Sequence, residues 1–227
     1  MILQMTRPVQ GGLRQERKLE ATSNHLANAD TAGFKKDVVS FDKVFKANLN
    51  TDFSQGQIKP TDNKLDVALG DQGFFKINTP EGIRYTRDGN FSLNTDGVLV
   101  NQNGYAVQGA NGEIVLNGQN IEINEAGEIM VDRLPVDNLD IVTFDDLTSL
   151  KKQGGDLFFY KGDAAADEKE PDRLVVKQGA LEGSNIQVVD EMVGMIDHHR
   201  MYETYQKMMQ TFDEVDGKAI NEVGKLQ

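Results

Sequence analysis

The sequence predicts an α+β fold. In it, long N- and C-terminal helices pair as a coiled-coil-like α-domain, with an inserted all-β middle domain of antiparallel hairpins between them. Two observations lead to this prediction. Both ends of the 227-residue chain carry apolar or small residues in alternating steps of four and three, which is the spacing of one helix face. The middle of the chain carries short β-prone runs separated by glycine turns.

The N-terminal helix is predicted between residues 5 and 29. Gly12, Leu19 and Leu26 recur at seven-residue intervals and therefore share one face of the helix. Because proline is tolerated only in the first turn, Pro8 places the start of this helix near residue 7.

The C-terminal helix is predicted from Ser184 to about residue 224. Ser184 and Gln187 have the spacing of a capping box, which marks a helix start. Two apolar rows follow, offset by about one residue, as in a stutter of a coiled-coil seam. The first row is Val189, Val193 and Ile196, and the second is Met201, Tyr205, Met208, Phe212, Val215 and Ala219.

Between these helices the sequence changes character. Residues 65–176 consist of short runs rich in aromatic and β-branched residues, divided by Asp-Gly and Asn-Gly pairs that favour tight hairpin turns. We therefore divide the chain into an N-terminal assembly helix with its closing motif (1–35), an extended connector (36–64), the β-rich middle domain (65–176) and a C-terminal assembly helix (177–227). A lone amphipathic helix is marginal in water, so we expect the terminal helices to need each other or neighbouring subunits.

Composition excludes several classes of partner. With 36 acidic and 24 basic residues the formal net charge is −12, which repels nucleic acid and anionic lipid. The chain has no cysteine, so disulfides and thiolate metal sites are excluded. No apolar run reaches the roughly 18 residues of a membrane span, and we expect neither a cleavable signal peptide nor a membrane-embedded protein.

The residues capable of chemistry are few. His199 and Glu203 are spaced i, i+4 beside His198, but a zinc site needs a third ligand, and we interpret all three as solvent-facing helix residues. The turns at 88–90 and 94–97 resemble fragments of calcium loops but lack the spacing to a closing glutamate. We therefore predict no enzyme: no catalytic residues, no metal, no cofactor and no small-molecule substrate.

Three runs, in this order along the chain, resemble the rod and hook proteins of the bacterial flagellum. The runs are 23–35 (SNHLANADTAGFK), 65–109 with its G-F-F and Y-T-R-D-G elements, and 178–186 (QGALEGSNI). The L-E-G-S-N sequence at 181–185 and the short interval between Phe34 and Leu65 are most similar to the proximal rod branch of that family, and the distal rod branch is the alternative.

The resemblance implies a structural subunit of the flagellar basal-body rod in the periplasm, exported unfolded by the flagellar type III export apparatus. Its partners would be other rod subunits, both copies and paralogues, including the distal rod protein. The terminal helices would line an axial tube that transmits torque and encloses the export channel, with the β domain outside.

For the signature residues the resemblance implies assembly roles. Leu26 and Phe34 would anchor in apolar contacts, Asn28 and Thr31 would bond backbone groups at the helix end, and Gly33 would adopt a backbone conformation closed to other residues. An intramolecular helix cap and turn would use the same five residues equally well. Beyond the family, the alternative is a β-sheet binding module on a coiled-coil stalk.

Overall fold

The structure is a computed structural model of the whole chain that describes residues 2–42, 47–118 and 120–223. The chain forms two compact units. The helical unit contains residues 1–27, 37–50 and 187–227, as far as these are described, and the β unit contains residues 28–36 and 51–186. The chain therefore crosses between the units several times, and the β unit is inserted between segments of the helical unit.

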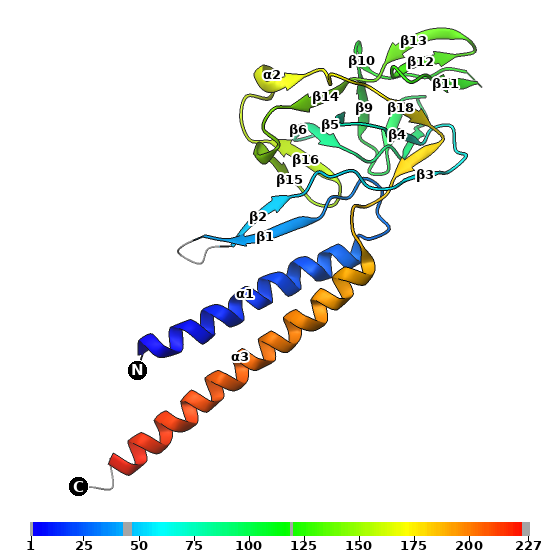
Figure 1. Cartoon of the computed structure of the whole chain (residues 1–227). Helices are drawn as coiled ribbons and strands as arrows, with labels where there is room; N and C mark the ends of the chain where they lie inside the picture. The colour runs from blue at the N-terminus through cyan, green and yellow to red at the C-terminus, as the bar shows by residue number, and fades with distance from the viewer. Residues whose placement is uncertain (1, 43–46, 119, 224–227) are drawn as a thin grey trace. The chain divides into compact units, whose positions relative to one another are not determined.

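The helices and the first strands follow this order (Figure 1). The three α-helices are α1 (Ile2–Ala27), the single turn α2 (Ala164–Asp167) and α3 (Val188–Val223), and a 3-10 turn spans Leu147–Ser149. The strands before residue 90 are β1 (Asp37–Phe41), β2 (Ala47–Thr51), β3 (Ile58–Pro60), β4 (Val67–Leu69), β5 (Phe74–Thr79) and β6 (Gly82–Thr86).

The remaining strands all belong to the β unit. They are β7 (Phe91–Leu93), β8 (Leu99–Asn101), β9 (Ala106–Gly109), β10 (Gly112–Glu113), β11 (Ile121–Ile123), β12 (Glu128–Val131), β13 (Leu134–Asn138), β14 (Ile141–Phe144), β15 (Leu150–Lys152), β16 (Leu157–Tyr160), β17 (Glu168–Lys169), β18 (Val176–Gln178) and β19 (Ala180–Glu182).

A ten-stranded antiparallel sheet organises the β unit. Its main path runs β15-β16-β6-β5-β9-β8-β7, while β10 pairs with β9, and β14 pairs with both β5 and β17. Successive side chains of a strand point to opposite faces, so β5 places Phe75 and Ile77 in one buried cluster and Phe74 in another. Apolar burial on both faces accounts for the two adjacent phenylalanines at the start of this strand.

Two strand pairs connect the beginning of the β unit's sequence with its end. β3 pairs with β19, and β4 pairs with β18, so strands more than a hundred residues apart in sequence form two-stranded ladders. Asp-Gly and Asn-Gly pairs turn the chain within the unit, with positive φ at Gly97, Gly104 and Gly112.

In the helical unit α1 and α3 lie side by side and antiparallel (Figure 1). Tyr205 of α3 lies against Gly11 and Gly12 of α1, and Glu191 at the start of α3 lies against His25 at the end of α1. The strands β1 and β2 form a separate two-stranded ribbon, which meets α1 where the Arg14 guanidinium lies 5.1 Å from the centre of the Phe41 ring.

The predicted pairing of the terminal helices as a coiled-coil-like α-domain is wrong. The described chain has one N-terminal and one C-terminal helix around a mostly β middle, and most of the α3 rows assigned to the seam are exposed. The exposed members are Val189, Val193, Ile196, Met201, Met208, Val215 and Ala219.

The coiled-coil prediction fails because of which residues the two helices bury. Of the predicted rows, only Tyr205 and Phe212 are shielded. The other shielded residues of α3 lie a residue or two away from the rows and include polar groups, among them Glu191, Met195, His198, Tyr202 and Met209. The shielded residues of α1 are mostly small or polar: Pro8, Gly12, Gln15, Leu19, Thr22 and Leu26. A coiled-coil seam requires apolar side chains at both repeating positions, and neither set of shielded residues supplies them.

The close approach of the two helices depends on Gly11. A Cβ atom at this position would lie 2.4 Å from Tyr205 Cε1, so a larger residue must displace the ring. We expect Gly11→Val to destabilise the helical unit by about 1–3 kcal/mol through overpacking. Hydrogen exchange of the α1 amides would measure the loss.

The matched control is Gly194→Ala on α3, where a Cβ would meet nothing within 4 Å. Because alanine favours helix over glycine by about 1 kcal/mol, this variant should be neutral or stabilising. Equal protection of α1 in Gly11→Val and in the wild type would contradict the close packing.

Candidate functional site

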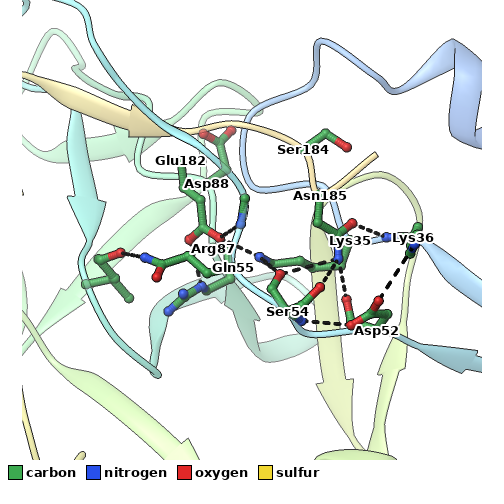
Figure 2. A network of polar contacts seen from close by, with 12 residues as sticks. Lys35, Lys36, Asp52, Ser54, Gln55, Arg87, Asp88, Glu182, Ser184 and Asn185 are labelled. Carbon is green, nitrogen blue, oxygen red and sulfur yellow. Dashed lines mark hydrogen bonds and ion pairs between the residues drawn. The ribbon is translucent and has the colours of Figure 1, made fainter. Parts of the chain in front are cut away.

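Three charged side chains meet inside the β unit and form a buried ion cluster, Lys35, Arg87 and Glu182 (Figure 2). Lys35 follows the Gly33-Phe34 turn, Arg87 lies between β6 and β7, and Glu182 ends β19. The Lys35 Nζ atom lies 2.5 Å from Glu182 Oε1, and Arg87 Nε lies 3.0 Å from Glu182 Oε2. The Lys35 and Glu182 side chains are 0% exposed, so both charges are shielded from bulk solvent.

Backbone groups complete the cluster. Both cations donate to carbonyl oxygens, and the carboxylate accepts a backbone N–H. These bonds join Lys35 Nζ to Ser54 O (2.8 Å), Arg87 Nη1 to Asp71 O and to Gly73 O (both 2.7 Å), and Gly56 N to Glu182 Oε1 (2.9 Å). Removing one partner from such a buried pair typically costs about 3–5 kcal/mol, because the remaining charge is left without compensation.

Burial acts on the protonation of the two cations. It lowers the pKa of Lys35 and the pKa of Arg87, and the carboxylate of Glu182 acts against both shifts. The cluster is therefore held by a single shared anion between two cations, and the attraction of Glu182 opposes the loss of the Lys35 proton in the interior.

Asn185 extends the cluster into a second set of bonds (Figure 2). Its Oδ1 accepts from the backbone N of Lys36 at 2.8 Å, and its Nδ2 donates to the carbonyl of Asp52 at 2.8 Å. The backbone N of Asp52 in turn donates to the carbonyl of Lys36 at 2.9 Å. One amide side chain thus connects the segment that follows α1, the segment that follows β2 and the segment that precedes α3.

Gly33 turns the chain into the cluster. Its φ is +67°, and a Cβ atom there would lie 2.3 Å from the backbone N of Asp88, so no other residue fits. Its N–H donates to the carbonyl of Glu182 at 2.8 Å. The turn after the first helix therefore packs directly against the backbone of the Y-T-R-D-G element.

Asp88 carries an unusual carboxyl group beside this turn. Burial raises the pKa of Asp88 to about 7, and the nearby charges of Asp156 and Asp66 add to the rise, while the bond from the backbone N of Asn90 opposes it. At neutral pH this carboxyl is therefore protonated in a large fraction of molecules.

The signature residues of the first run lie in the β unit or at the end of α1. Phe34 is buried at 1% exposure under Lys152, whose Nζ lies 4.0 Å from the ring centre. Thr31 donates from its backbone N to the carbonyl of Asn28 at 3.2 Å, and from Oγ1 to Asn28 Oδ1 at 3.3 Å. Leu26 is half-buried on α1. These contacts are intramolecular, and the assembly roles of these residues stay predictions.

The predicted seam residues divide into two groups. Leu19 of α1 and Tyr205 and Phe212 of α3 are half-buried, while the other α3 residues of the two rows face outward.

Sequence reasoning gave no role to the residues of the ion cluster. Lys35, Arg87 and Glu182 each stand inside one of the three recognised runs. What the sequence does not contain is which distant segments meet, and the cluster joins the turn after α1, the segment after β6 and the end of β19.

The two adjacent histidines of α3 have different surroundings. His199 Nδ1 lies 3.5 Å from Glu203 Oε1 on the exposed side of α3, whereas His198 lines a small cavity near α1. Among the described residues, no three His, Cys, Asp or Glu side chains are grouped so that they could hold a metal ion. Nor does any described helix combine the length and apolarity needed to cross a membrane.

Comparisons with known proteins find relatives along most of the chain. Residues 68–131 match the family model "Flagellar hook protein FlgE/F/G D1 domain", and residues 177–222 match "Flagellar basal body rod FlgEFG protein C-terminal". The chain is 30% identical to the flagellar basal-body rod protein FlgF of Caulobacter vibrioides, over 92% of this chain and 93% of that protein. It is 26% identical to the flagellar hook-basal body complex protein FlhO of Bacillus subtilis, over 94% and 96%. It is 29% identical to the flagellar basal-body rod protein FlgG of the same organism, over 90% and 92%.

The buried carboxyl of Asp88 predicts a pH dependence of stability. An unfolded aspartate is charged above about pH 4, whereas Asp88 in the folded chain keeps its proton up to about pH 7, so the folded state binds more protons in that window. Stability is therefore lost as the pH rises from about 4 to about 7. We expect Asp88→Asn, which keeps the acceptor for Asn90, to be more stable than the wild type at pH 8 by at least about 1 kcal/mol, and equally stable near pH 4.

Urea unfolding at both pH values would measure this difference. The matched control is Asp96→Asn in the exposed Asp96-Gly97 turn, which should not alter the pH dependence. A stability difference of Asp88→Asn that is the same at pH 4 and pH 8 would show that burial does not act on this carboxyl.

Proposed function

This chain belongs to the flagellar basal-body rod protein family, and we propose that it joins neighbouring subunits of the rod through an exposed apolar face of α3. Membership makes it a structural subunit of the flagellar basal-body rod. The observation that carries the proposal is the outer α3 face, which we define as Val189, Met192, Val193 and Ile196.

The outer α3 face points away from α1. Val193 precedes the shielded Met195 by two residues, which is about half a helical turn, and the other three members share the side of Val193. Their exposed fractions run from 52% for Ile196 to 72% for Val189. α3 therefore has two opposite contact faces, of which only one is used within the described chain.

Several apolar side chains of α3 are exposed. With Val188, Met201, Met208 and Val215, these apolar side chains are 44–72% exposed, and exposed apolar surface of this kind is typical of an interaction site. This exposure fits a helix that is covered on assembly.

The partners in this proposal are copies of this chain and paralogous rod subunits, including the distal rod protein. A contact between two different surface patches repeats without closing and builds an open helical tube, whereas a self-complementary patch would stop at a dimer. The similarity to FlgF favours the proximal part of the rod. We extend the proposal to export by the flagellar apparatus and to assembly in the periplasm, where the tube encloses the channel.

Torque transmission is part of the same proposal, and the buried ion cluster supports it. The cluster and Asn185 fix the segments that follow α1 and precede α3 into the β unit. A force on either segment therefore acts against buried ion pairs and ladder hydrogen bonds instead of a free loop.

The proposal predicts that a charge on the outer α3 face blocks assembly. Burying an unpaired carboxylate costs several kcal/mol, and each 1.4 kcal/mol is tenfold in affinity. We expect Val193→Asp combined with Ile196→Asp to abolish swimming and to reduce the number of rod-containing basal bodies, counted by electron microscopy, by at least about tenfold.

The control is Gln206→Asp, which adds a charge at an exposed polar position of the same helix and should leave swimming unchanged. Circular dichroism should show that both variants fold as the wild type does. Normal basal bodies in the folded double variant would rule out the outer α3 face as a contact.

A further inference from the structure

His25 joins three elements of the helical unit. It lies near the end of α1 and is 5% exposed. Its Nδ1 lies 3.0 Å from Oε2 of Glu191 in the first turn of α3, and its Nε2 lies 3.0 Å from the backbone N of Asp37, the first residue of β1. One imidazole thus bonds both helices and the ribbon.

The chemistry of these partners determines where the imidazole proton is. A backbone N–H can only donate, so Nε2 must accept from Asp37 and carry a lone pair. The proton of neutral His25 therefore resides on Nδ1 and is donated to the carboxylate of Glu191. Both ring nitrogens are engaged, and only one of the two neutral tautomers is compatible with the bonds.

Further charged groups surround the ring. A cavity of about 190 Å³ is lined by His25, by Lys18 of α1, by Asp37 of β1 and by His198 of α3. The carboxylates of Glu191 and Asp37 attract a proton toward this region, and the ammonium of Lys18 repels it. Burial first, and Lys18 next, lower the pKa of His198, so this second histidine stays neutral at pH 7 and adds no charge.

We propose that His25 is a proton-sensitive link, and that its protonation releases β1 from the two helices. A proton from solvent adds to the lone pair of Nε2 and makes both ring nitrogens donors. The bond from Nδ1 to Glu191 persists and becomes charge-assisted, whereas the bond from the Asp37 N–H has lost its acceptor. Two donors then face each other, the Nε2–H of the imidazolium and the Asp37 N–H, which favours opening at the start of the ribbon.

The link bears on the ribbon because His25 bonds the first residue of β1. A two-stranded hairpin is marginal in water, and β1 and β2 pair only with each other in the described chain. This inference rests on the contacts of the isolated helical unit and does not require the proposed assembly. Its failure and the failure of the rod contact are therefore distinguishable.

Nuclear magnetic resonance of the full-length subunit tests the link directly. At pH 8, long-range proton–nitrogen spectra should show His25 with its proton on Nδ1. When the pH is lowered from about 8 to about 5, the hydrogen-exchange protection factor of the Asp37 amide should drop at least tenfold.

Two variants separate the link from general pH effects. In His25→Gln the side-chain oxygen can accept from Asp37 and the amide nitrogen can donate to Glu191, but nothing titrates, so protection of the Asp37 amide should be independent of pH. His199→Gln changes an exposed histidine of α3 and should keep the pH dependence of the wild type.

Three results would overturn the proposal. They are a proton on Nε2 of His25 at pH 8, the same protection of the Asp37 amide at pH 8 and pH 5 in the wild type, and a pH-dependent loss of that protection that persists in His25→Gln.

Discussion

The buried ion cluster of Lys35, Arg87 and Glu182 is the constraint on which the rest of this structure depends. Two buried cations share one buried carboxylate, so removing Glu182 would leave two positive charges in the interior without compensation. The three side chains come from segments far apart in sequence, and their pairing fixes where the chain leaves the β unit toward α1 and where it leaves toward α3.

The helical unit follows a different principle. α1 offers α3 a row of mostly small and polar residues, and the close approach at Gly11 takes the place of interlocking apolar side chains. The apolar residues that α3 does not use against α1 stay on its outer face. A rod subunit has to be held together inside and still have surface for its neighbours, and this division of α3 into two faces serves both needs in the assembly that we propose.

Local features could be predicted from the sequence, whereas the pairing of distant segments could not. Turn chemistry at Asp96-Gly97 and Asn103-Gly104 was readable because positive φ is a property of the glycine itself. The apolar rows at 189–196 and 201–219 were also readable, but the prediction buried them in a coiled coil, and the structure exposes most of them. Periodicity identifies a face and does not say what covers it. The ion cluster and the His25 link were not predicted, because each depends on which distant segments meet in the fold. A single sequence, read without an alignment, does not show which segments these are.

A double-mutant cycle on Lys35 and Glu182 tests the central claim most directly. Urea unfolding would be measured for the wild type, Lys35→Met, Glu182→Leu and the double variant, with the exposed pair Lys169 and Asp145 as the reference cycle. Our account predicts a coupling energy of about 2 kcal/mol or more for the buried pair and less than about 1 kcal/mol for the exposed pair. A buried-pair coupling below about 0.5 kcal/mol, which is within the error of additivity, would show that the cluster does not hold the two chain segments together.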